Sequence, residues 1–366
     1  MESPIRNARI DALRGLAIAA VLLLHFNLAY HLSAGPNAAG LGPRLLRALT
    51  INGNFGVTMF FAISGFLITN MAMTRFGSPA EVRPRTFYAF RFARIMPSLA
   101  LALGLIVLLS LAGLEIFQNT GHGACLPGSS YLTVLLSVLT FWHNVLMAYR
   151  GYFNYCVNIY WSLSVEEVFY LAFPLACLLL KRRRWLLGLC ALLIVIGPVY
   201  RHLHPDDDIQ YLYAYLACFD AIAMGCAAAL LAPRLPRPGR ILQAAAALLV
   251  AAVFLRGISG HVDFGFSLIG LGTAILLLGS GSGSGRISGN PWLGWLRWLG
   301  RHSYELYLFH IIVLALMLTA VPRKVLPAGW KPAWLLVFLG LSAILAWTVA
   351  RFWSAPLNGR IRERLT

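Results

Sequence analysis

The feature that most restricts the fold of this chain is a succession of apolar runs, each close to 20 residues long. A helix of about 20 mostly apolar residues is what crosses the hydrocarbon core of a bilayer. We predict ten spanning helices of this kind. They lie near residues 10–30, 54–74, 94–116, 158–180, 185–201, 211–232, 240–256, 263–280, 302–320 and 333–353. The fold class expected is therefore all-α, a polytopic membrane helix bundle of about ten transmembrane helices whose first partner is the lipid bilayer.

Composition and charge agree with a bilayer as the solvent. Hydrophobic residues make up 59% of the chain and charged residues only 12%, whereas a soluble domain carries about 25% charged residues. The formal net charge of +17 raises the alternative of a nucleic-acid partner. The basic residues, however, stand in short clusters between apolar runs, such as Lys181–Arg184, and this distribution is typical of the positive-inside rule. We expect no nucleic-acid partner.

The apolar run at 131–149 is predicted to be a re-entrant or interfacial helix rather than a span. If it crossed the bilayer, the Lys181–Arg184 cluster would lie on the outer side; without that crossing, the cluster and both chain termini are cytoplasmic. On this topology only eight of the 30 Lys and Arg residues lie outside. They are Arg44, Arg47, Arg150, Arg201, Arg256, Arg323, Lys324 and Lys331. The asymmetry favours the ten-helix arrangement.

Nothing in the sequence marks a second domain. Residues 279–285 alternate Gly and Ser, as a flexible linker does. We expect one membrane domain over residues 1–366, with no attached soluble domain and with a retained first helix rather than a cleaved signal peptide. The six cysteines have no zinc-binding spacing, and we expect no metal. Cys125 and Cys156 flank one external segment and can form a disulfide if that side is oxidising.

The first predicted helix carries three ionisable residues that a span does not need. Arg14 and His25 are eleven residues apart, which in a helix is three turns plus roughly 20° and about 16 Å. Both therefore lie on one face, with Asp11 one turn before Arg14 and able to hold its guanidinium. One interpretation is a positive-inside Arg and a packed polar His. The other is an anion anchor at the inner surface and a general base deeper in the membrane.

Arg91 and Arg94 precede the third predicted helix. Their spacing places both on one face of a helix start near the inner surface. Guanidinium forks bind phosphate oxygens bidentately, and a helix N-terminus adds a favourable dipole. Together with Arg14 they are predicted to form a phosphate pocket.

Two adjacent carboxylates, Glu166 and Glu167, follow Trp161 at the predicted outer end of the fourth span. They point about 100° apart, so only one is expected to face the bundle interior. One interpretation is an acidic pair stabilised by the helix dipole. The functional interpretation is that one carboxylate orients His25 or contacts an acceptor hydroxyl, with Trp161 beside it.

The remaining candidates would orient groups or contact an acceptor. Ser303 and Tyr304 open the ninth predicted span, and His310 follows two turns later. Tyr304 can reach a polar group of a ligand, although an aromatic stripe is as often packing. His143 and Asn144, in the run at 131–149, are further candidates for acceptor contact.

Taken in order, these segments resemble the acyltransferase-3 family of integral membrane O-acyltransferases. The resemblance rests on Arg9–Gly15 followed by His25, Phe60–Ile68, Arg91 with Arg94, Trp161–Glu167, and Ser303–His310, and it covers residues 9 to about 350. It implies a multi-pass protein of the bacterial inner membrane that moves an acyl group, usually acetyl from acetyl-CoA, to an envelope glycan or another acceptor. The family's pattern of a basic residue and a later histidine falls on Arg14 and His25, and its paired arginines fall on Arg91 and Arg94.

The resulting hypothesis is an O-acetyltransferase with cytoplasmic acyl-CoA as the donor. Arg14, Arg91 and Arg94 hold the phosphates, and His25 either deprotonates an acceptor hydroxyl or first takes the acetyl group itself. The acceptor is a glycan or a small molecule with a hydroxyl. The alternative from another class is a polytopic transporter or flippase that uses buried ionisable residues as a substrate or proton path.

Overall fold

The computed structural model describes residues 7–33, 41–118, 130–153, 155–258, 260, 262–280 and 290–365. Within these ranges the chain is helical and has no strand, so the predicted all-helical polytopic class is confirmed. Eight described segments are long and apolar enough to cross a membrane. Their principal helices are α1 (Ala8–Tyr30), α3 (Asn54–Phe76), α4 (Pro84–Leu111), α7 (Trp161–Leu180), α8 (Arg183–Leu203), α10 (Tyr215–Leu231), α15 (Ser303–Ala320) and α16 (Lys331–Val349).

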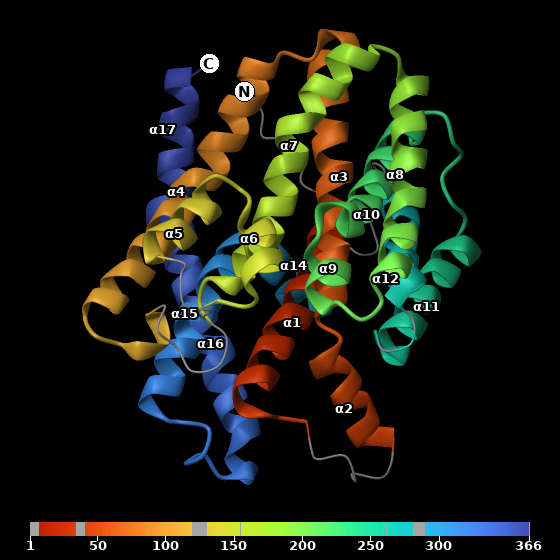
Figure 1. Ribbon diagram of the computed structural model, residues 1–366. Coiled ribbons are helices and arrows are strands. Elements are labelled where there is room, and N and C mark those ends of the chain that lie inside the picture. Colours follow the sequence, from red (N-terminus) through yellow and green to blue (C-terminus); the bar gives the residue numbers. More distant parts are fainter. Residues whose placement is uncertain are drawn as a thin grey trace. The chain divides into compact units, whose positions relative to one another are not determined.

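The other two predicted spans form the helices α11 (Arg240–Arg256) and α12 (Val262–Leu278), which run side by side (Figure 1). Each has 17 residues, the lower end of the range of about 17–25 that spanning helices use. A glycine makes their close approach possible, because a Cβ built at Gly272 would lie 2.6 Å from the side chain of Val250.

The run at 131–149 is broken into two short helices. We predicted that this run does not cross the membrane as one helix, and the break agrees with that prediction. The run forms α5 (Tyr131–Leu139, 9 residues) and α6 (His143–Arg150, 8 residues), and neither is long enough to span a bilayer. The turn between them holds Phe141 at φ 64°, a left-handed conformation that a bulky residue rarely adopts.

Three short helices were not predicted: α2 (Leu41–Ile51), α14 (Gly294–Arg301) and α17 (Ala355–Leu365). Each has arginines interleaved with apolar residues, so a search for 20-residue apolar runs passes over them. The remaining elements are α9 (Asp208–Tyr213), the short 3-10 turns η1 (Pro79–Glu81), η2 (Glu115–Phe117), η3 (Asn158–Tyr160), η4 (Pro291–Leu293) and η5 (Ala328–Trp330), and a π-helical turn η6 (Ala350–Ser354).

The helices group into two compact units, each built from separated parts of the chain. The first unit contains residues 1–74, 187–202 and 219–304. Its closest helix contacts are made through glycine: a Cβ at Gly300 of α14 would lie 1.7 Å from the carbonyl oxygen of Asp11, and one at Gly225 of α10 would lie 1.9 Å from that of Ala62 in α3. Small residues allow such close contact between membrane helices.

The second unit contains residues 75–186, 203–218 and 305–366. In it α4 packs against α7 and α17. The ring of Phe87 stacks on that of Phe173 with the centroids 5.8 Å apart, and Tyr88 Oη donates to the carbonyl of Leu171 at 2.7 Å. Near the middle of α4, the indole nitrogen of Trp353 donates to the carbonyl of Pro97 at 2.8 Å, an oxygen close to the place where proline interrupts the helix ladder.

Candidate active site

The helix α1 carries Arg14 and His25 without interruption, so the spacing of eleven residues is realised in one continuous helix. Asn7 caps its start, since the Asn7 side chain accepts a hydrogen bond from the backbone nitrogen of Arg9 at 3.0 Å. The Arg9 guanidinium then donates to the carbonyl of Gly279 at 3.0 Å. These contacts fix the beginning of α1 against the end of α12 within the first unit.

His25 is held in one tautomer. Its Nδ1 lies 2.9 Å from the carbonyl oxygen of Val21, one turn earlier. A carbonyl oxygen only accepts, so Nδ1 is the donor and carries the proton. In the neutral ring the basic lone pair is therefore on Nε2. The ring itself is half-buried. A histidine with this arrangement can accept a proton through Nε2, as a general base or a nucleophile must.

Arg14 is oriented by a residue that the sequence also singled out. Its Nε donates to the hydroxyl of Ser303 at 3.1 Å, and Ser303, the first residue of α15, is buried. Asp11 lies 4.0 Å from Nε of Arg301 in α14, a neighbour that the sequence did not predict. The pairing of Asp11 with Arg14 stays a prediction. Tyr304, the next residue of α15, is half-buried.

Arg91 and Arg94 belong to the second unit, and the structure corrects their place in the helix. We predicted that they stand at a helix start, but α4 begins at Pro84. Its first turns are rich in arginine and aromatic residues, which an apolar-run criterion excludes. The prediction that a helix N-terminal dipole helps these two arginines to bind phosphate is therefore wrong, because the effect of the dipole is confined to the first turn.

Arg91, one of the two arginines, lies near the acidic pair in the second unit. The guanidinium carbon of Arg91 lies 3.7 Å from the ring centroid of Tyr170, and the Tyr170 hydroxyl donates to Glu166 at 3.3 Å. The charge of Arg91 also acts on Glu167, which is buried. Arg91 therefore lies at the same level of the unit as the two carboxylates. We predicted Arg91 near the inner surface and the carboxylates at the outer end of a span, and these two positions are not both right.

The two carboxylates differ in their surroundings. Glu166 is half-buried and accepts from Tyr170, whereas Oε1 of Glu167 is buried and has no hydrogen-bond partner among the described residues. A buried carboxyl oxygen without a partner is costly in a fold, and its presence calls for an explanation such as a functional role. Glu167 is therefore the stronger functional candidate. The hypothesis that one of the two orients His25 stays a prediction.

His143 and Asn144 form a second polar group in the same unit. The backbone nitrogen of His143 donates to Ser164 of α7 at 3.2 Å, and Asn144 Nδ2 donates to the carbonyl of Tyr213 at 3.1 Å. Trp161 packs beside them, with its ring centroid 4.5 Å from that of Tyr213. These contacts dock α6 on α7 and α9.

The imidazole of His143 is also fixed in one tautomer. The Ser137 hydroxyl donates to the carbonyl of Val134 at 2.7 Å, so it accepts from His143 Nδ1 at 2.8 Å. The lone pair of the ring is then on Nε2, which is buried and has no hydrogen-bond partner among the described residues. Burial lowers the pKa of His143 to about 3, so the ring is neutral at neutral pH.

His310 is buried in α15, and its Nδ1 donates to the carbonyl of Leu306 at 2.9 Å. Tyr307 lies one turn before His310 in the same helix. In the structure the Tyr307 hydroxyl donates to the carbonyl of Ile159 at 2.7 Å and lies 2.6 Å from the Ser162 hydroxyl. The two late motifs, around 162 and around 307, are thus joined by hydrogen bonds.

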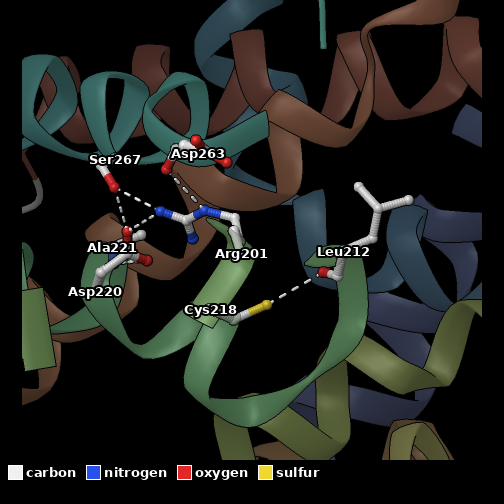
Figure 2. A network of polar contacts seen from close by, with 7 residues as sticks. All are labelled: Arg201, Leu212, Cys218, Asp220, Ala221, Asp263 and Ser267. Atoms are coloured by element: carbon white, nitrogen blue, oxygen red, sulfur yellow. Dashed lines mark hydrogen bonds and ion pairs between the residues drawn. The ribbon is translucent and has the colours of Figure 1, made fainter. Parts of the chain in front are cut away.

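One buried ion pair was missed altogether. Arg201 donates to Asp220 at 2.7 Å and to the hydroxyl of Ser267 at 2.6 Å. Ser267 donates to the same carboxylate oxygen at 2.6 Å, which closes the network drawn in Figure 2. Arg201 and Asp220 are both 0% exposed. Arg201 was predicted to lie on the outer side of the membrane, and the structure shows its side chain buried among α8, α10 and α12. A single Asp in the apolar run 211–232 was the available signal.

Two predictions cannot be compared fully with the structure. Cys125, the proposed partner of Cys156, lies outside the described residues. Among the residues that are described, no group of three or more His, Cys, Asp or Glu side chains is placed to hold a metal ion. The absence of a metal stays a prediction.

Comparisons with known proteins bear on the family. Residues 7–352 match the acyltransferase domain of the acyltransferase-3 type. The chain is 26% identical to the peptidoglycan O-acetyltransferase OatA of Listeria monocytogenes over 95% of its own length and 55% of that protein. It is 25% identical to the putative peptidoglycan O-acetyltransferase YrhL of Bacillus subtilis over 88% and 50%, respectively. The chain thus spans about half the length of these relatives. No solved structure matches it significantly.

Proposed function

The chain belongs to the acyltransferase-3 family, and on this basis we propose that it transfers an acetyl group from cytoplasmic acetyl-CoA to a hydroxyl of a glycan outside the membrane. The names of the relatives favour a cell-wall glycan of the peptidoglycan class as the acceptor. The observation that carries the proposal is the fixed tautomer of His25, whose Nε2 holds the basic lone pair within an apolar helix.

In the proposed reaction, His25 Nε2 removes the proton of the acceptor hydroxyl as the oxygen attacks the thioester carbonyl. The tetrahedral intermediate collapses, the carbon–sulfur bond breaks, and the CoA thiolate leaves and takes up the proton from the imidazolium. The products are the acetyl ester and CoA. In the alternative route Nε2 attacks first and an acetyl-histidine carries the group to the acceptor. The Nδ1 hydrogen bond to Val21 supports either route, because it keeps the lone pair on Nε2.

The donor is proposed to be held by its phosphates. Arg14, Arg91 and Arg94 supply guanidinium groups, which bind phosphate oxygens bidentately. Ser303 positions Arg14 through the hydrogen bond to its Nε, and the Tyr170 ring positions Arg91. The pair His143 and Asn144 is proposed to contact the acceptor, since each has a buried polar atom without a partner among the described residues.

The reaction is tested by replacing His25. The variant His25→Ala is expected to lose acetyl transfer by about 100-fold or more, because a positioned general base contributes about 10²–10⁴-fold. Transfer of labelled acetyl from acetyl-CoA to a soluble glycan fragment would be measured with purified protein in nanodiscs.

The matched control is His202→Ala, which removes an exposed imidazole from the same unit. This variant should keep its activity. His25→Ala should reach the membrane in normal amount and elute as the wild-type protein does. Acetyl transfer by His25→Ala at the wild-type rate would remove His25 from the reaction.

A further inference from the structure

Four arginines gather in the second unit, and two of them were not candidates in the sequence. Arg75 lies in the last turn of α3, Arg91 and Arg94 lie in α4, and Arg362 lies in α17. The guanidinium carbons of Arg75 and Arg362 lie 4.3 Å and 4.9 Å from the ring centroid of Phe90. Two cations that are far apart in the sequence therefore share one aromatic ring.

The other three arginines are close enough to Arg362 to repel its charge. Arg362 is partly buried and is acted on by the positive charges of Arg94, Arg75 and Arg91. A guanidinium does not relieve this repulsion by losing its proton. The faces of Phe90 and Tyr170 offset part of it, and the carboxyl group of Glu167 is close enough to interact with Arg91. The Nε of Arg91 is buried and has no hydrogen-bond partner among the described residues. A polyanion would stabilise this cluster, because it would offset the positive charges and accept a hydrogen bond from Nε of Arg91.

The charge of the cluster matches the nucleotide end of CoA. That end carries a pyrophosphate, which has two negative charges, and a 3′-phosphate monoester, which has about −1.5 to −2 at neutral pH. A monoester offers three terminal oxygens, enough for two guanidinium forks. Resting on the acyl-CoA donor of the proposed function, we propose that Arg75 and Arg362 bind the 3′-phosphate of CoA, while Arg91 and Arg94 bind the pyrophosphate. The cluster then distinguishes CoA from its 3′-dephospho form.

The test compares the binding of CoA and 3′-dephospho-CoA by calorimetry, with the full chain in phosphatidylcholine nanodiscs. Wild-type protein is expected to bind CoA about tenfold more tightly, the factor that one charged hydrogen-bonding contact supplies. Arg75→Gln and Arg362→Gln should each remove most of this preference and leave the affinity for 3′-dephospho-CoA within about twofold. The double variant Arg91→Gln/Arg94→Gln should weaken both ligands alike.

Two further variants separate recognition from folding. Arg364→Gln changes an exposed arginine of the same helix outside the cluster, and should alter neither affinity. Arg362→Lys keeps the positive charge but loses the two parallel N–H donors of the guanidinium, and should retain an intermediate preference for CoA over 3′-dephospho-CoA. A loss of binding shared by both ligands in Arg75→Gln or Arg362→Gln would overturn the proposal, because it would mark a general role in the fold.

The experiment also separates this proposal from its rivals. Equal affinity of the wild-type protein for the two ligands would refute the 3′-phosphate site and leave the acyl-CoA donor intact. No binding of either ligand would refute the donor itself. An anionic lipid headgroup presents similar phosphate chemistry, so the measurements are repeated in phosphatidylglycerol nanodiscs. If the arginine substitutions change only the amount of phosphatidylglycerol retained on purification, the cluster is a lipid site and the proposal is wrong.

Discussion

Short-range hydrogen bonds fix the tautomers of the histidines in the candidate site. His25 and His143 each donate through Nδ1, to a carbonyl and to a serine hydroxyl respectively, and each presents its lone pair at Nε2. Arg91 is different, because its guanidinium lies against the face of Tyr170. An aromatic face holds a guanidinium without occupying its donors. Such a contact keeps the N–H groups available for an anion.

The contact of Arg91 with Tyr170 predicts a graded effect on donor binding. Tyr170→Leu removes the aromatic face, worth about 0.5–2 kcal/mol, and is expected to raise the KM for acetyl-CoA by about 3- to 30-fold. Tyr170→Phe keeps the ring and loses only the hydroxyl that donates to Glu166, so it should stay within about threefold of wild type. Steady-state kinetics of both variants check the expectation. An equal rise in KM for the two variants would assign the effect to the hydroxyl instead.

At the scale of elements, contacts between helices were hardest to anticipate. The helix α14 is short and rich in Arg and Trp, yet it packs closely along α1 through Gly15 and Gly300. In the same unit α8, α10 and α12 are joined by Arg201, Asp220 and Ser267 (Figure 2). Both features depend on which helices become neighbours, and periodicity within one helix does not contain that information.

The close approach of α14 to α1 predicts that Gly300→Ala is strongly destabilising. The added Cβ would lie 1.7 Å from a backbone oxygen of α1, so the two helices must separate. Overpacking of this kind costs about 1–3 kcal/mol or more. The melting temperature of the purified variant should fall clearly. Gly104→Ala, a helix glycine with nothing within 4 Å of the new Cβ, should melt at or above the wild-type temperature.

The buried ion pair predicts a different pattern of substitutions. Asp220→Ala leaves the guanidinium of Arg201 buried without its carboxylate, and should destabilise the protein by about 3–5 kcal/mol. The double variant Arg201→Met/Asp220→Leu removes both charges and should recover much of that loss. Thermal unfolding of the wild-type protein, Asp220→Ala and the double variant would give the order of their stabilities. A double variant less stable than Asp220→Ala would contradict the prediction that the unpaired charge of Arg201 causes the loss of stability.

At the scale of the whole molecule, each compact unit is assembled from three separated stretches of sequence. The early helix α1 and the late helix α14 share one unit, and α4 and α17 share the other. A polytopic chain of this kind brings distant motifs together by folding back through the bilayer several times. The position of each loop relative to the membrane follows from the number of crossings.

The topology with both termini cytoplasmic predicts the behaviour of reporter fusions. Alkaline phosphatase joined after Arg150 should be active, because that point is proposed to be external, and phosphatase joined after Arg182 should be inactive. Green fluorescent protein at the C-terminus should fluoresce. The pair of fusions also tests whether α5 and α6 leave the chain on the same side. An inactive fusion after Arg150 together with an active one after Arg182 would show that the run at 131–149 crosses.

The sequence by itself determined the helical class, the approximate spans and the identity of Arg14, His25, Arg91 and Arg94 as candidates, because hydropathy and helical spacing are properties of a single segment. It also singled out Ser303, but not its contact with Arg14. Only the tertiary structure decided that Arg91 stands beside Tyr170 and Glu167, that Arg75 and Arg362 share the ring of Phe90, and that Arg201 is buried against Asp220. These pairings join residues far apart in the chain, and they arise from the packing of whole helices, which no local pattern specifies.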